Sequence, residues 1–125
     1  MIKIVFCLRR LPSLSLPAFH AYWYETHAPL VREVAPALRI RRYTQSHSFA
    51  DPRIMPAVAA RGCGVAPYDG VAELWWETIG DILAAGATPE SRAAGRRLLA
   101  DERNFIDLEN STLFFTQEHE IITRA

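Results

Sequence analysis

The chain has 125 residues, 50% of them hydrophobic and 22% charged, and its 14 basic side chains balance its 14 acidic ones. This length and composition are typical of one globular domain with a real apolar core, and they exclude a disordered chain or a coiled coil. The absence of net charge argues against nucleic acid or an anionic membrane as a partner.

The first two predicted elements are a strand and a long helix. Residues 2–9 form an apolar run of strand length, and Ser15 can cap a helix that extends to about Ala35. Pro29 removes one backbone bond inside this helix, so we expect a kink or a loosened turn just after His27. At 100° per residue, one narrow sector holds Phe19, Trp23, His27, Leu30 and Val34.

A second strand is predicted over 39–49, followed by a long irregular segment. Alternation along this strand places Tyr43, Gln45, His47 and Phe49 on one face. Residues 50–67 contain three prolines and the Arg-Gly-Cys-Gly break at 61–64, with room for one or two helical turns between 52 and 60. We expect this segment to be a mobile lid over the mouth of a pocket.

The second half of the chain repeats the strand, helix and strand pattern. A strand is predicted over 68–77, helix starts at Thr78 and Thr88 with the second piece reaching about Asp107, and a closing strand over 113–122. The order βαββαβ indicates an α+β, ferredoxin-like fold, a four-stranded antiparallel sheet with helices on one face. Strands apolar on both sides need a second cover, so we expect a homodimer whose sheets face each other.

His27 is the leading candidate for chemistry, because the helical pattern carries its imidazole into an aromatic-lined interior. There the imidazole either bonds to backbone within the core or acts on a ligand as a base or an acid. The break at Pro29 makes this part of the helix irregular, which favours the functional interpretation.

Glu102 is the second candidate. On a helix that begins at Pro89, it shares a face with Leu98 and Phe105, where burial would raise the pKa of its carboxyl toward the range of a general acid or base. The alternatives are that Glu102 reaches solvent or pairs with an arginine, or that a one-residue slip in phase places Asp101 in the pocket instead.

His47 is a third candidate for acid or base, because it shares a strand face with Tyr43. The pocket wall is expected to come from aromatic side chains, and the substrate-binding residues predicted are Trp23, Tyr24, Tyr43, Trp76 and Phe105.

Several kinds of site are not indicated. The two cysteines, Cys7 and Cys63, form no paired motif, and His20 and His27 are too far apart along a helix to share one metal ion. No glycine-rich phosphate loop or nucleophile turn is present. The sequence also shows no signal-peptide pattern and no apolar run of membrane length, so a cytoplasmic protein without metal or cofactor is expected.

Four motifs follow one another along the chain: Trp-Tyr-Glu-Thr-His-Ala-Pro-Leu at 23–30, Pro-Tyr-Asp-Gly-Val-Ala-Glu-Leu-Trp-Trp at 67–76, Asp-Glu-Arg-Asn-Phe-Ile-Asp at 101–107 and Glu-His at 118–119. Together they resemble the EthD-domain family of dimeric α/β-barrel proteins, over nearly the whole chain. The family takes its name from ethyl tert-butyl ether degradation, and similar domains act as dehydratases or decarboxylases in aromatic polyketide pathways. The resemblance implies a cofactor-free site between sheet and helices, led by His27 in its His-x-Pro motif.

Two functions from different classes remain open at this point. One is a small enzyme that transfers protons on a hydrophobic or aromatic metabolite, in a dehydration, decarboxylation, isomerisation or cyclisation. The other is an accessory protein that binds a hydrophobic intermediate for an oxygenase system without converting it. A haem-dependent or oxidative role has no support beyond single histidines.

Overall fold

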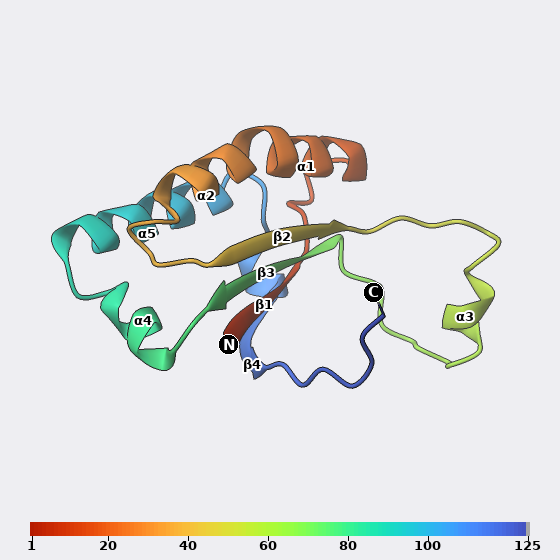
Figure 1. Ribbon diagram of the computed structural model, residues 1–125. Helices are drawn as coiled ribbons and strands as arrows, with labels where there is room; N and C mark the ends of the chain where they lie inside the picture. Colours follow the sequence, from red (N-terminus) through yellow and green to blue (C-terminus); the bar gives the residue numbers. More distant parts are fainter. Residues whose placement is uncertain (125) are drawn as a thin grey trace.

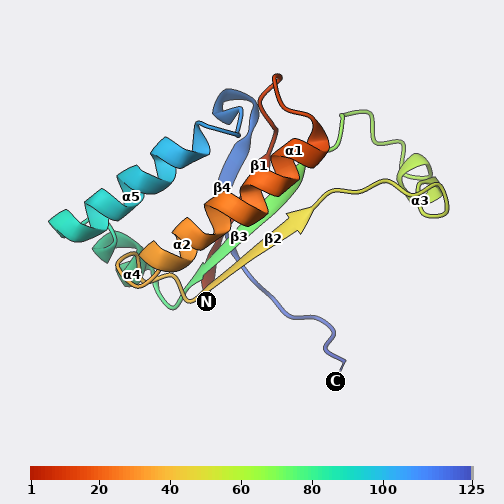
Figure 2. The ribbon, with the colours of Figure 1, turned by 90° about the horizontal axis from the view of Figure 1, so that it is seen from above.

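The computed structural model describes residues 1–124, and its centre is a single four-stranded sheet (Figure 1). The strands are β1 (Ile2–Leu8), β2 (Arg42–His47), β3 (Gly70–Trp76) and β4 (Thr112–Gln117), in the spatial order β2-β3-β1-β4. All three neighbouring pairs are antiparallel. The long helices lie together over one face of this sheet (Figure 2), so the predicted α+β, ferredoxin-like fold is confirmed.

Helix starts follow the predicted capping signals. Ser15 accepts from the Ala18 N–H ahead of α1 (Leu16–Tyr22), and Thr78 does the same for α4 (Ile79–Ala84). Thr88 and Ser91 form a reciprocal capping box at the start of α5 (Pro89–Glu102). The remaining helical pieces are α2 (Ala28–Val34), α3 (Pro56–Ala59) and a short 3-10 turn at Leu108–Asn110.

A π-helical turn, Trp23–His27, joins α1 to α2. Pro29 has no N–H for an α-helical bond, and the Ala28 N–H bonds to the Trp23 carbonyl five residues back. The loosened turn therefore lies before Pro29, whereas we had predicted it just after His27. Beyond this turn Val34 is buried as predicted, whereas Leu30 is only partly buried and its neighbour Val31 is buried instead.

The helix-facing side of the sheet holds the core beneath α1 and α5. Strand register places Phe6 opposite Ala72 and Leu8 opposite Gly70 on this side. Gly70 is required here, because a Cβ at this position would lie 2.4 Å from the Trp23 ring and 2.9 Å from the Ser46 carbonyl oxygen. Trp23 therefore rests directly on the backbone of β3.

Within residues 1–124, no helix covers the opposite face of the sheet (Figure 1). Lys3 forms ion pairs with Glu73 at 2.6 Å and with Glu118 at 3.3 Å on this face, and its ammonium lies over the Trp75 ring. Four other side chains lie on the same face of the sheet as this ionic group, namely Val5, Cys7, Val71 and Phe114.

Several elements are shorter than predicted. α5 ends at Glu102 instead of Asp107, because the following residues leave the helix to bond with the end of β1: Leu11 N–H donates to the Phe105 carbonyl, and Asp107 N–H to the Arg9 carbonyl. β4 ends at Gln117 instead of 122, because its last partner, Ile2, is the first residue of β1.

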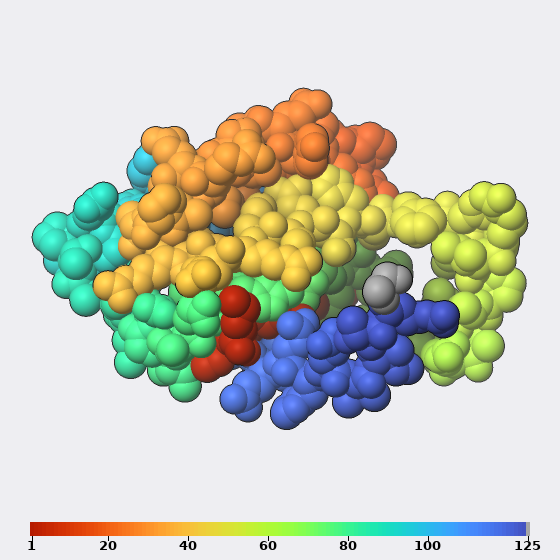
Figure 3. All heavy atoms as spheres, viewed as in Figure 1, coloured from red at the N-terminus to blue at the C-terminus, as the bar shows by residue number. Residues whose placement is uncertain are grey.

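Residues 50–67, predicted as a lid, project from the end of the sheet where β2 ends and β3 begins (Figures 1 and 2). In Figure 3 this yellow-green segment, which includes α3, stands apart from the helical layer. No residue of the segment lines the cavity or the groove described below. Its closure over the site remains a prediction.

Candidate active site

A small cavity lies between the helices and the sheet, and both His27 and Glu102 line it. The rest of its lining is apolar apart from Tyr43 and comes from β1, β2, β3, the helices and the segment after α5: Phe6, Leu8, Trp23, Val31, Tyr43, Ala72, Leu74, Leu98 and Ile106. About 40 Å³ of it is open to water, which accommodates a few ordered water molecules. Typical ligand sites measure roughly 300–1,000 Å³, so a ligand must displace a side chain to enter.

His27 is held by a carboxylate on the facing helix. Its Nδ1 lies 2.7 Å from Oδ2 of Asp101, and the imidazole is 5% exposed. Burial lowers the pKa of His27, and the hydrogen bond and negative charge of Asp101 oppose that effect without reversing it. A neutral imidazole must then donate from Nδ1, which leaves the Nε2 lone pair free to accept a proton.

Asp101 itself is fixed by two further donors. The Tyr22 hydroxyl donates to Oδ1 at 2.5 Å and the Asn104 amide at 3.3 Å. Burial acts to raise the pKa of Asp101, but the hydrogen bonds from Tyr22, His27 and Asn104 together hold it below its ordinary value. Asp101 is therefore an anion at neutral pH, and it orients His27 much as the aspartate does in a catalytic triad.

Glu102, the next residue, has the opposite behaviour. Burial, and secondly the charge of Asp101, raise its pKa from 4.5 to about 7. The cavity thus combines a neutral imidazole with a carboxyl group that is about half protonated at neutral pH. Titratable groups with displaced pKa values in one cavity are typical of active sites that use general acid and base catalysis.

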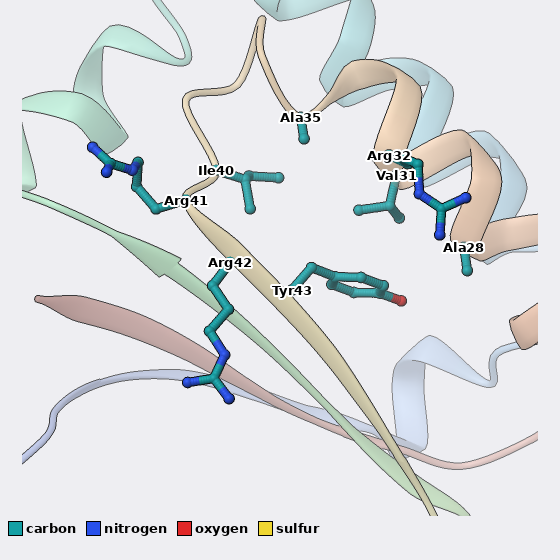
Figure 4. A pocket seen from close by; sticks show the side chains of 8 residues that line it. All are labelled: Ala28, Val31, Arg32, Ala35, Ile40, Arg41, Arg42 and Tyr43. Carbon is teal, nitrogen blue, oxygen red and sulfur yellow. The ribbon is translucent and has the colours of Figure 1, made fainter.

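Outside the cavity, a groove runs between α2 and β2 (Figure 4). It consists of two hollows of about 360 and 230 Å³ that share Ala28, Arg32 and Tyr43. In Figure 4 the Tyr43 ring extends from β2 toward α2, beneath Val31. Tyr43 and Val31 also line the inner cavity, so these two side chains lie between the cavity and the groove.

His47 lines the outer groove and not the inner cavity. Its ring stacks on Trp23 with centroids 4.6 Å apart, and its Nε2 lies 2.8 Å from Oε1 of Gln45. Burial, and secondly the nearby His20, lower the pKa of His47. The structure therefore brings His27 together with Glu102 and leaves His47 on the other side of the Trp23 ring.

The predicted aromatic wall is only partly assembled at the site. Trp23 and Tyr43 line the cavity, and Tyr24, 68% exposed, lines the groove. Phe105 is fully buried and packs behind His27, with ring centroids 4.9 Å apart, but it does not line the cavity. Trp76 is buried elsewhere, where its Nε1 donates to the Leu38 carbonyl, so it is not placed to contact a ligand.

Sequence reasoning left open whether Asp101 or Glu102 faces the site, and the structure gives each a separate place there. Both residues are partly buried at the end of α5. The pairing of Asp101 with His27 depends on how α5 crosses the π-helical turn, and no motif in the sequence signals it. The same holds for Tyr22 and Asn104, which complete the carboxylate's hydrogen bonds.

A metal site and a membrane-spanning helix are both absent from residues 1–124. No group of three histidine, cysteine or carboxylate side chains in this range is arranged to hold a metal ion. No helix in the same range has the length and apolar character needed to cross a membrane.

The EthD domain model matches residues 11–109, so the chain belongs to the EthD domain family. That match includes His27, Asp101 and Glu102, and Phe6 and Leu8 of the cavity wall lie just before it. A search of curated proteins finds no match.

Solved structures agree with this assignment. An EthD family protein from Bacillus halodurans is 22% identical over 95% of this chain and 99% of its own, with a TM-score of 0.61. An EthD-like protein from Ralstonia eutropha is 18% identical over 93% and 89%, with a TM-score of 0.57. A protein from Bacteroides fragilis, described as dimeric and ferredoxin-like, is 8% identical over 94% and 95%, also at 0.57. These likenesses establish the fold.

Proposed function

We propose that the protein is a small acid–base enzyme that acts on a small hydrophobic or aromatic metabolite without a cofactor. The observation that carries the proposal is the His27–Asp101 pair beside Glu102 in one apolar cavity. Structural histidines in cores usually have both nitrogens bonded, whereas Nε2 of His27 has no protein partner among the described residues.

The roles follow from the protonation states. His27 Nε2 removes a proton from a carbon of the ligand, and the Asp101 carboxylate stabilises the imidazolium that forms. Protonated Glu102 then gives its proton to the oxygen that gains charge or leaves. In a dehydration, the C–H pair goes to the new double bond while the C–O bond breaks, and the hydroxyl departs as water. Isomerisation uses the same two groups, with the proton returned to a different atom.

The test uses 5-nitrobenzisoxazole, whose ring opens to an absorbing phenolate once a single proton is removed. We expect His27→Gln to lower the catalysed rate by about 10²–10⁴-fold, the range for a lost general base. His119→Gln, an exposed histidine on the C-terminal segment, is the matched control and should leave the rate unchanged. Equal rates for the wild type and His27→Gln, with the probe still bound, would contradict the enzymatic proposal and favour a binding protein.

We also propose that the protein is a homodimer whose sheets face each other, as in a dimeric α/β barrel. Two observations support this: the sheet face opposite the helices is uncovered, with Phe114 45% exposed on it, and the Bacteroides relative is described as dimeric. Burying this face against a second copy would remove apolar surface from water at about 25 cal/mol per Å².

A further inference from the structure

The hydroxyl of Tyr43 already accepts two hydrogen bonds. Trp23 Nε1 lies 3.2 Å away, and an indole nitrogen can only donate. Gln45 Nε2 lies 2.9 Å away and also bonds to the Trp23 carbonyl, which can only accept, so this end of the Gln45 amide must be the NH₂. Both lone pairs of the Tyr43 oxygen are therefore occupied by donors.

The proton of the Tyr43 hydroxyl has no such partner. Among residues 1–124, the hydrogen bonds of this oxygen are the two that it accepts, and no carbonyl or carboxylate takes its proton. Two accepted bonds fix the phenol in place and polarise its O–H. Burial raises the pKa of Tyr43, so the group keeps its proton at neutral pH.

The position of this donor matches the route into the site. Tyr43 lines both hollows of the outer groove and the inner cavity beside His27 and Glu102. A ligand that enters between α2 and β2 must pass this hydroxyl. The neighbouring walls, Val31, Leu74 and Trp23, are apolar and contribute no second hydroxyl at this point.

We propose that the ligand carries a carbonyl or phenolic oxygen next to its reactive carbon, and that the Tyr43 hydroxyl donates a hydrogen bond to that oxygen. The inference rests on the proposed acid–base function of the same site and assigns its ligand class, an oxygenated apolar ring or ketone.

Tyr43 then has a direct part in the proton transfer. When His27 Nε2 takes the proton from the carbon beside a carbonyl, the C–H electron pair becomes a carbon–carbon double bond and the carbonyl π pair moves to oxygen. The negative charge on that oxygen strengthens the bond from Tyr43, so the donor stabilises the enolate more than the ketone.

The experiment compares two probes of nearly the same shape, 1-indanone and indane, which differ in the carbonyl. Binding is followed in the ¹⁵N NMR spectrum by the indole resonance of Trp23, whose N–H contacts the Tyr43 oxygen. We expect the wild type to bind 1-indanone about 2- to 12-fold more tightly than indane, the range for one neutral hydrogen bond. Tyr43→Phe should abolish this preference and leave indane affinity unchanged. Tyr68→Phe, which removes a hydroxyl bonded to Thr112 away from the site, should retain the preference.

The outcomes separate the two proposals. Equal binding of both probes by the wild type, or a preference that survives in Tyr43→Phe, would overturn the role of Tyr43 and leave the acid–base function standing. A Tyr43-dependent preference in a protein whose rate does not respond to His27→Gln would support the oxygen site and contradict catalysis. Failure of 1-indanone to perturb the Trp23 resonance would overturn the ligand class assigned here, while the effect of His27→Gln on the 5-nitrobenzisoxazole rate would still decide the acid–base function.

Discussion

Adjacent carboxyl groups at the end of α5 have pKa values displaced in opposite directions. Asp101 receives hydrogen bonds from Tyr22, His27 and Asn104, which hold its pKa low. Glu102 lines the apolar cavity beside that negative charge, and its pKa rises to about 7. Two neighbouring positions on α5 thus hold an orienting group that is charged at neutral pH and an acid that titrates there.

The raised pKa of Glu102 has a measurable effect on stability. Between pH 4.5 and about 7 the folded state keeps a proton that the unfolded chain releases, so this group's contribution is complete below 4.5 and is lost as pH rises through 7. We expect Glu102→Gln to raise the free energy of unfolding at pH 8 by about 3 kcal/mol, with little change at pH 4.5.

Urea unfolding at the two pH values measures this difference. The lowered pKa of His27 gives the wild type an opposite slope below 6.5, where the unfolded chain binds the extra proton, but His27 is present in both proteins and its effect largely cancels. Glu120→Gln, on the exposed C-terminal segment, is the control. A constant difference at both pH values would show that burial does not displace the pKa of Glu102.

At the scale of elements, the site depends on how closely the π-helical turn approaches β3. Gly70 lets the Trp23 ring rest on the strand backbone, and Trp23 in turn bonds to Tyr43 and Gln45. We expect Gly70→Ala to destabilise the protein by about 1–3 kcal/mol, because a Cβ at 2.4 Å forces the ring to move. The Trp23 indole resonance should shift with it.

Gly95 in α5 is the matched control for that substitution. A Cβ there meets nothing within 4 Å, and the position lies inside a helix. Gly95→Ala should stabilise the protein by about 0.5–1 kcal/mol through helix propensity alone. Thermal unfolding of the two variants should therefore give changes of opposite sign, and a neutral Gly70→Ala would show that the contact with Trp23 is not tight.

Local patterns were sufficient to predict the elements, because each depends on residues close in sequence. Alternation and caps at Ser15, Thr78 and Thr88 gave the strands and the helix starts. The π-helical turn was predicted only as a kink or loosened turn near Pro29, and the burial of Val31 beyond this turn was not predicted. A hydrophobic period cannot reveal an insertion in the hydrogen-bond ladder.

For the candidate site, individual residues could be predicted from the sequence but their partners could not. Burial of His27 and Glu102 follows from helical phase, which is why both could be named in advance. The hydrogen-bond partners of these groups come from other elements. Asp101 is 74 residues from His27 in the sequence, and Gln45 is 22 residues from Trp23. Such contacts are set by helix crossing and strand register, which are properties of the folded chain.

At the scale of the whole molecule, the sheet has two unequal faces. One is covered by helices and contains the site, while the other exposes apolar side chains around the Lys3–Glu73 pair. Trp75 is already buried on this second face by Lys3, Arg42 and Glu118 within one chain. Phe114, which has no such cover, is therefore the sharper probe of whether a second copy packs here.

We expect the wild type to sediment as a dimer of the 14.1 kDa chain at micromolar concentration, and Phe114→Asp to sediment as a folded monomer. A charge placed in a dry interface costs several kcal/mol, and two-fold symmetry would introduce it twice. Leu113→Asp is the matched control. Leu113 is 49% exposed and Phe114 is 45% exposed, but the Leu113 side chain points to the helix side of β4. It should leave the dimer intact. A wild-type monomer would contradict the dimer itself, whereas dissociation by Leu113→Asp with a stable Phe114→Asp dimer would move the interface to the other side of β4.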